Sequence, residues 1–399
     1  MRAMPLQAIS LLLHAFVGWR LVPALGSVPA GVALAAVLAV SALTLPYGLG
    51  ARRGATGRRA ALLSWVGLLG MGLFSSLLVL TVARDLVLLA GVAANAIRPD
   101  TIDLASLVVP SARAAAIAAA VVTLWGFVNA RRTAPVVRVD VPMAGLPAAL
   151  DGFTIAQISD VHVGPTIKRP FVEAIVASVN ALDADLVAIT GDLVDGSVDQ
   201  LADDVAPLAG LRSKEGVFFV TGNHEYYSGA DAWVRELRRL GLRVLVNEHV
   251  VVRRGDARLV VAGVSDFSAA HFDRARASDP AAALAGSPAG ALRLLLAHQP
   301  RSAAAAEAAG FDLQLSGHTH GGQFLPWNFL VRLQQPFTAG LHRWRRMWVY
   351  TSRGTGYWGP PKRFGAPSEI TLLRLVALSA PAAHDVAPGS PVAVTLPAG

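Results

Sequence analysis

The chain has 399 residues, of which 53% are hydrophobic and only 16% are charged, and its mean hydropathy is +0.48. This composition excludes an ordinary soluble protein, so part of the chain is expected to lie in lipid. Residues 1–134 hold 11 basic and 3 acidic residues, whereas the rest of the chain holds 24 of each, so the net charge of +8 belongs to the apolar part. Membrane topology explains that excess better than nucleic acid, and no nucleic-acid partner is expected. The absence of cysteine excludes disulfides and thiolate metal sites.

Long uncharged runs near the N-terminus predict transmembrane helices. The runs cover 3–19, 21–51, 61–83 and 114–130. Because a span needs about 20 apolar residues, we predict helices near 4–22, 29–50, 61–83 and 112–130. Residues 1–132 are then a transmembrane region of about four helices, with the lipid bilayer as a partner. The shorter apolar run 86–97 either prolongs the third helix or lies at the membrane interface.

The arginines between these spans predict the orientation in the membrane. Four spans put the second-to-third loop and the segment after the fourth span on one side, and these hold Arg52, Arg53, Arg58, Arg59, Arg131 and Arg132. The positive-inside rule makes that side cytoplasmic, so we expect a multi-pass protein whose C-terminal domain is cytoplasmic. One miscounted span would reverse this orientation.

The remainder of the chain predicts an α/β domain. Residues 133–150 contain proline and are expected to be a linker, 151–378 a globular domain, and the Ala- and Pro-rich residues 379–399 a disordered tail. Strands are expected at 153–158, 185–190 and 216–221, with helices at 170–182, 199–211 and 230–240. Further strands are expected at 243–247, 249–253, 258–263, 292–297, 311–315, 347–351 and 369–376, with a helix at 302–309. This pattern favours two packed sheets with helices outside.

Polar residues follow five of the expected strands, at the point where each strand ends. Ligands of open α/β sheets bind at the carboxyl ends of strands, so we expect these side chains to share one cleft. In chain order they are Asp160, His162, Asp192, Asn223, His224, His298, His318 and His320. A group of unrelated polar turn residues is the alternative, and five separate strands argue against it.

Carboxylate, imidazole and amide ligands suit divalent metals such as Mn, Fe, Zn or Ni. The set exceeds what one ion needs. It suits two ions about 3.5–4 Å apart that share a carboxylate, the arrangement that activates water and binds a phosphoryl group. The sequence therefore predicts two divalent metal ions as cofactors.

These motifs resemble those of the calcineurin-like metallophosphoesterases. The matches are D-x-H at 160–162, G-D at 191–192, G-N-H-E at 222–225, His298 and G-H-T-H at 317–320, in the same order and at comparable spacing. The resemblance covers roughly 151–376 and implies the metallophosphoesterase fold, a two-sheet β-sandwich flanked by helices. The longer form G-H-T-H-G-G-Q at 317–323 and the apolar N-terminus are similar to the membrane-associated bacterial branch related to the transmembrane protein with metallophosphoesterase domain. That branch implies the bacterial inner membrane.

The resemblance also implies a role for each matched residue. Asp160, His162 and His320 would hold one metal, Asn223, His298 and His318 the other, and Asp192 would bridge them. A hydroxide between the metals would attack phosphorus, and His224 would donate a proton to the leaving oxygen or bind phosphate. Glu225 stands where many members have Asp, and we expect it beside the metal ligands rather than among them.

The predicted function is that of a membrane-anchored phosphoesterase that hydrolyses phosphodiester or pyrophosphate bonds. The anchor favours a lipid-linked or nucleotide-linked phosphate ester, and soluble phosphodiesters or phosphoproteins are the other substrates to consider. In a different class of function, the spans form a transporter or sensor and the phosphoesterase-like domain is regulatory.

Three further features have two interpretations each. Residues 354–359 fit the G-x-G-x-x-G pattern, but Pro360 and Pro361 follow where a dinucleotide-binding fold needs a helix, so we reject that interpretation. The insert 324–348 is either a loop over the sheet or an aromatic and basic lip that meets a lipid surface or the acyl part of an anionic substrate. Its aromatic and basic residues are Trp327, Phe329, Phe337, Arg343, Trp344, Arg345, Arg346 and Trp348. Arg353 and Arg363 are candidates for phosphate contacts or for surface ion pairs.

Overall fold

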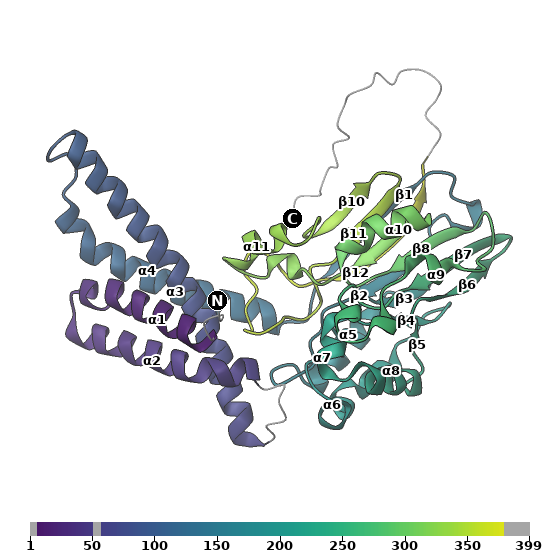
Figure 1. The fold of residues 1–399 in the computed structure, drawn as a ribbon, viewed down its shortest axis with the longest axis horizontal. Coiled ribbons are helices and arrows are strands. Elements are labelled where there is room, and N and C mark those ends of the chain that lie inside the picture. The colour runs from purple at the N-terminus through teal and green to yellow at the C-terminus, as the bar shows by residue number, and fades with distance from the viewer. Residues whose placement is uncertain (1–5, 51–56, 379–399) are drawn as a thin grey trace.

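The protein consists of a bundle of four long helices beside a domain of two packed sheets (Figure 1). The computed structural model describes residues 6–50 and 57–378. The predicted tail at 379–399 and the loop residues Arg52 and Arg53 lie outside the described residues.

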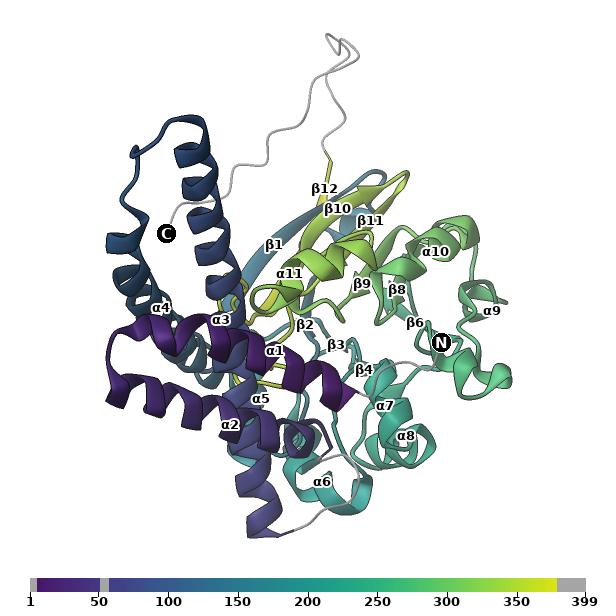
Figure 2. The same ribbon diagram turned by 60° about the vertical axis from the view of Figure 1, so that its left-hand side comes forward.

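The bundle confirms the prediction of four apolar N-terminal helices. They are α1 (Leu6–Leu21), α2 (Val28–Gly50), α3 (Arg58–Ile97) and α4 (Leu104–Arg131), and each is long and apolar enough to cross a membrane. The run 86–97 prolongs α3, which therefore has 40 residues and a length of about 60 Å. In both views the connected ends of α3 and α4 project beyond α1 and α2 (Figure 1, Figure 2).

Because α3 continues to Ile97, two charged residues lie inside it. Asp85 accepts hydrogen bonds of 2.7 and 2.9 Å from Arg20 of α1. Arg84 donates to Asp85 at 3.2 Å and to the Ser111 hydroxyl of α4 at 2.9 Å. Charges in a membrane region are costly unless they are paired, and this cluster pairs them while joining three helices.

The domain contains two six-stranded sheets. The first has the order β1 (Val136–Met143), β12 (Ile370–Ala377), β2 (Thr154–Ile158), β3 (Leu186–Ile189), β4 (Val217–Phe219) and β5 (Arg243–Val244). The second has the order β10 (Gly340–Trp344), β11 (Met347–Thr351), β9 (Leu313–Ser316), β8 (Leu292–Leu296), β7 (Ala257–Gly263) and β6 (Glu248–Arg254). Strands β2 to β5 are parallel, as are β7, β8, β9 and β11.

Alternation along the strands divides the domain into three apolar layers. Ile155 and Leu294 point into the core between the sheets, whereas their neighbours Ala156 and Leu295 point to the outer faces. The outer face of the first sheet packs on α5 (Arg169–Asn180), α6 (Val198–Val205) and α8 (Ala230–Arg239), and that of the second on α9 (Pro280–Leu284) and α10 (Ala303–Ala309). The predicted two-sheet sandwich flanked by helices is confirmed.

Strand β1 lies inside the stretch 133–150 that we predicted as a linker. It pairs with β12 over its whole length, and Val141 and Met143 are buried in the core between the sheets. We missed it because six of its eight side chains are wholly or partly exposed at this sheet edge and because Pro142 interrupts the run. The prediction also missed the short helices α7 (Asn223–Ser228) and α11 (Trp327–Leu330) and the strand β10.

Candidate metal centre

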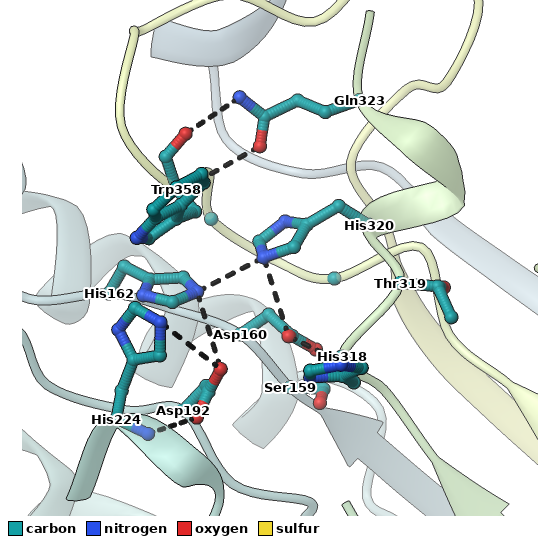
Figure 3. A network of polar contacts seen from close by, with 12 residues as sticks. Ser159, Asp160, His162, Asp192, His224, His318, Thr319, His320, Gln323 and Trp358 are labelled. Atoms are coloured by element: carbon teal, nitrogen blue, oxygen red, sulfur yellow. Dashed lines mark hydrogen bonds and ion pairs between the residues drawn. The ribbon is translucent and has the colours of Figure 1, made fainter. Parts of the chain in front are cut away.

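The predicted site residues occupy the turns that follow β2, β3, β4, β8 and β9, and these turns meet at one edge of the sandwich (Figure 3). The turns are joined to one another through the backbone. The Asp160 amide donates to the Gly191 carbonyl at 3.0 Å, and the His162 amide to the Asp192 carbonyl at 3.1 Å. The Gly317 amide donates to the His298 carbonyl at 2.9 Å, so residues far apart in sequence are held in one rigid frame.

The predicted ligands form groups of three residues. Within each group, one nitrogen or oxygen atom of each residue lies within 4.8 Å of those of the other two. One group is Asp160, His162 and His320, and another is Asp192, His298 and His318. A third contains His162, Asp192 and His224, which connects the first two. The structure therefore brings together every predicted carboxylate and histidine of the site.

Asp192 lies at the junction of these groups and is 2% exposed. Its Oδ2 is 3.1 Å from His298 Nε2 and 3.9 Å from His162 Nε2. Its Oδ1 accepts a hydrogen bond of 2.8 Å from the His224 amide, which fixes the carboxylate in place (Figure 3). This is the position that a carboxylate shared by two ions requires.

Asn223 supplies an independent test of whether the residues fit metal ions. Its side-chain Oδ1 is buried and has no hydrogen-bond partner among the described residues. An unpaired buried amide oxygen costs about 1–3 kcal/mol, so it is retained where a ligand satisfies it. Together with the neighbouring carboxylates and imidazoles, this oxygen completes a donor set that fits divalent ions.

Hydrogen bonds fix which nitrogen of two histidines faces the centre. His298 Nδ1 donates to the Thr190 carbonyl at 2.7 Å, which leaves Nε2 toward Asp192. His162 Nδ1 contacts Asp195 at 3.2 Å, which leaves Nε2 3.0 Å from His320 Nε2. An acceptor at one ring nitrogen orients the other nitrogen as a metal ligand.

Burial and neighbouring charges shift the pKa values of three histidines of the site. Burial lowers the pKa of His318 to about 3, and burial together with Arg363 holds the pKa of His320 well below its ordinary value. Both imidazoles are therefore neutral, the form that binds metals. Burial alone would lower the pKa of His298, but the Asp192 carboxylate raises it well above its ordinary value, so metal binding there would release a proton.

Five of the seven predicted metal residues have a left-handed backbone. Their φ angles are 53° for Asp160, 55° for His162, 52° for Asp192, 70° for His318 and 52° for His320. Residues with side chains rarely adopt this conformation, and each instance costs on the order of 1 kcal/mol. The hydrogen-bonded turns and the packed sheets hold these residues in it, which concentrates backbone strain at the site.

Two glycines permit the close approach of the turns. A Cβ atom on Gly317 would lie 1.9 Å from the Ser159 hydroxyl and 2.2 Å from Asp160 Oδ2. A Cβ atom on Gly222 would lie 2.2 Å from Asp192 Oδ1. Any larger residue at either position would displace one of the predicted metal-binding carboxylates.

Asp195 is a site residue that the sequence analysis missed. Its Oδ1 contacts Nδ1 of His162 and Nδ1 of His224, so one carboxylate orients two of the histidines. Burial alone would raise its pKa, but these two histidines hold the pKa well below its ordinary value. The available signal was a second acidic residue three positions after Asp192 on the same turn.

Glu225 lies beside the predicted ligands rather than among them. Its carboxylate accepts hydrogen bonds from the amides of Asp192, Leu193 and Gly222 at 3.0, 2.8 and 2.6 Å. Burial, with Asp192 nearby, raises its pKa to about 8. The side chain therefore joins the turns after β3 and β4.

Neither arginine that we considered for phosphate contact has a free guanidinium. Arg353 pairs with Glu369 at 2.8 Å. Arg363 is 0% exposed and donates to backbone carbonyls around His320. Arg363 is therefore an internal residue and not a surface ion-pair partner.

Comparisons with known proteins identify the family and several relatives of the chain. Residues 153–322 match the model of the calcineurin-like phosphoesterase family. The chain is 38% identical over 265 residues to the transmembrane protein with metallophosphoesterase domain of Danio rerio, covering 64% of this chain and 61% of that protein. The Bos taurus protein of the same name is 40% identical over 269 residues and is covered to 60%.

The chain covers a larger share of one bacterial relative than of these two proteins. An uncharacterized metallophosphoesterase of Aquifex aeolicus is 33% identical over 224 residues, which cover 55% of this chain and 84% of that protein. The chain therefore belongs to the calcineurin-like metallophosphoesterase family.

Proposed function

We propose that the protein is a membrane-anchored, dinuclear-metal phosphoesterase that hydrolyses phosphodiester or pyrophosphate bonds. The observation that carries this proposal is the buried carboxylate of Asp192, which belongs to two of the groups of potential metal ligands. Within each group the ligand atoms lie within 4.8 Å of one another. Membership of a metal-dependent hydrolase family supports it.

In this proposal each group holds one divalent ion. Asp160, His162 and His320 bind the first ion, Asp192 binds both, and the second is bound by Asn223, His298 and His318. Ions of the Mn, Fe, Zn and Ni class suit this donor set. When bound, they supply an activated water and neutralise charge on the phosphoryl oxygens.

His224 is the proposed proton donor to the leaving oxygen. Its Nδ1 contacts Asp195, so its Nε2 is the nitrogen directed toward the centre, 3.8 Å from Asp192 Oδ2. Asp195 thus orients a general acid beside the place where the leaving group would depart. Binding of phosphate by the same nitrogen is the other role compatible with this position.

The surroundings of the site support a substrate with a lipid part. The chain leaving His320 leads to α11, which faces the bundle (Figure 1, Figure 2), and the Ser75 hydroxyl of α3 donates to the Leu325 carbonyl at 2.7 Å. On α11 and the turn after it, the exposed apolar residues are Trp327, Phe329, Leu330 and Leu333, which are 39%, 63%, 42% and 83% exposed. We name these four residues the apolar lip, and we propose that it meets the bilayer or the acyl part of a lipid-linked or nucleotide-linked phosphate ester.

Trp327 and Phe329 belong to the insert that we considered as a lip from the sequence, whereas two other tryptophans of that insert do not contribute to the apolar lip. Trp344 packs against the Phe337 ring at a centroid distance of 5.9 Å. Trp348 donates from Nε1 to the Pro142 carbonyl at 2.6 Å. Both tryptophans therefore pack within the domain, and we assign the apolar lip to α11 and the turn after it.

We propose further that the protein is a multi-pass protein of the bacterial inner membrane with its catalytic domain in the cytoplasm. Arg58 and Arg59 begin α3, and Arg131 ends α4 immediately before the domain. These residues lie at the domain-side ends of their helices, and arginines of short loops favour the cytoplasmic side.

Hydrolysis of bis-p-nitrophenyl phosphate by the full-length protein in detergent tests the activity. We expect turnover only with an added divalent metal and its loss on chelation. Asp192→Asn and His318→Ala should each lower kcat by at least about 100-fold because they remove proposed ligands of the ions. Asp199→Asn on the exposed side of α6 is the matched control. A protein that binds two ions yet hydrolyses no phosphate ester would favour a regulatory domain.

Asp195→Asn tests the proposed orientation of the proton donor. With metal at saturation, we expect kcat for a phosphodiester with an alkyl alcohol as leaving group to fall by about 100-fold, since the amide no longer fixes the His224 tautomer. Bis-p-nitrophenyl phosphate, whose leaving group needs little protonation, should lose much less. Equal losses for good and poor leaving groups would contradict a role in protonation.

The apolar lip is tested by the double variant Trp327→Ser with Phe329→Ser. We expect kcat/KM for CDP-diacylglycerol in mixed micelles to fall about tenfold, because two aromatic side chains no longer enter the lipid phase. Hydrolysis of bis-p-nitrophenyl phosphate should be unchanged. The exposed β1 residue Val136, changed to Ser, is the control, and equal effects on both substrates would remove the lip proposal.

The orientation is tested by adding a protease to intact spheroplasts and to inside-out membrane vesicles. We expect cleavage of the domain only in the vesicles, because the domain faces the cytoplasm. Cleavage in the spheroplasts would place the domain on the outer side and reverse the topology.

A further inference from the structure

A short loop, residues 357–363, lies between the helix bundle and the metal centre, and we call it the interface loop (Figure 1). It begins inside the G-x-G-x-x-G pattern at 354–359 that we rejected as a nucleotide motif. Tyr357 at its start receives a hydrogen bond of 3.0 Å from Arg131, the last residue of α4. The Gln323 side chain, on the turn after His320, donates to the Trp358 carbonyl at 2.9 Å (Figure 3).

Lys362 inserts its side chain from this loop into the bundle. It is 2% exposed, and its Nζ donates to the Gly72 carbonyl at 2.7 Å and to the Ser76 hydroxyl at 2.6 Å, both on α3. The ring of Phe324 lies 5.2 Å from the same nitrogen. Burial lowers the pKa of Lys362 to about 8. A buried amine is stable only where hydrogen bonds satisfy it, so these contacts fix the loop on α3.

The second helix, α4, holds the same loop through its backbone. The Arg363 amide donates to the Gly126 carbonyl at 2.8 Å. A Cβ atom on Gly126 would lie 2.7 Å from Lys362 Cγ, so glycine leaves the space that the lysine stem occupies. The loop is therefore attached to two helices of the bundle within a few residues.

Arg363 extends in the opposite direction, into the domain. It is fully buried, and its guanidinium donates to the carbonyls of His320 at 2.9 Å and Arg353 at 2.7 Å, and also to the Gly356 carbonyl. Its Nη2 lies 3.0 Å from Nδ1 of His320. One guanidinium thus contacts both the backbone and the ring of a proposed metal ligand.

We infer that Lys362 and Arg363 are positioning residues through which α3 and α4 determine the place of His320, which makes the helix bundle part of the metal centre. The inference rests on the proposed function, because His320 is a proposed ligand of the first ion. Displacing the loop moves His320, while the second ion keeps its own ligands Asn223, His298 and His318. Residues that orient a metal ligand typically change metal affinity by about 10–100-fold when they are altered.

The test is a titration of metal-free, full-length protein in lipid nanodiscs with Co²⁺, followed by the absorption bands of the bound ion. Gly126→Ala is the principal variant, because it lies in a membrane helix and pushes the Lys362 stem without touching the centre. Alanine is more favourable than glycine in a helix interior, so we do not expect this substitution to unfold α4. Gly18→Ala in α1 is the matched control, since its Cβ would lie at an ordinary 3.5 Å from Leu38.

We expect the wild type to bind two ions. Gly126→Ala and Lys362→Met should weaken one of the two binding steps by about 10–100-fold and change its absorption bands, leaving the other step unchanged. Asn223→Ala should weaken the step that these variants leave intact, and Gly18→Ala should match the wild type. Lys362→Arg, which keeps the donors, should restore part of the affinity.

Three results would overturn the inference, and they are distinguishable. If the wild type binds two ions and both Gly126→Ala and Lys362→Met bind them identically, the bundle is only an anchor, and the proposed function stands. If the wild type binds no Co²⁺, the proposed function fails together with the inference. Equal weakening of both steps would indicate a general loss of structure and would also overturn it.

Discussion

The burial of the Asp192 carboxylate among histidines is the constraint on which the rest of the structure depends. The carboxylate is almost completely buried, and atoms of His162, His224 and His298 lie within 3.9 Å of its Oδ2. A charge removed from water is costly unless partners compensate it, and here the compensation comes from strand ends of both sheets. The two sheets therefore have to meet at this edge for the carboxylate to be stable.

That requirement explains the strained backbone and the glycines of the centre. Five of the predicted ligands have a left-handed backbone, and Gly222 and Gly317 leave the space that the carboxylates of Asp192 and Asp160 occupy. The strain is local, whereas the apolar layers that oppose it extend through the whole sandwich. The same layers hold Asp195 and Glu225, which fix the histidine rings and the turns without being proposed ligands.

The bundle and the domain form one structure at the interface loop. Lys362 bonds to α3, and the adjacent Arg363 bonds to the His320 carbonyl, so two consecutive residues connect the bundle to the candidate metal centre. The apolar lip lies beside the same bundle (Figure 1, Figure 2).

The sequence by itself determined the four apolar helices, the two-sheet domain and the predicted ligands. The helices follow from uncharged runs long enough to span a membrane, and the ligand set follows from polar residues placed at the ends of predicted strands, such as Asp160 and His318. Both signals are local, because each depends only on residues adjacent in the chain. The roles of these residues stay predictions for experiment.

Only the tertiary structure decided strand β1, the length of α3, the place of Asp195 and the link from Lys362 to α3. Strand β1 depends on pairing with β12, more than 220 residues later, and Lys362 bonds to a carbonyl 290 residues earlier. Hydrophobic periodicity carries no information about such pairs, because the energy of a buried lysine or an edge strand is set by what packs against it. The sequence therefore specifies which groups the chain offers, and the packing of bundle on domain decides which of them meet.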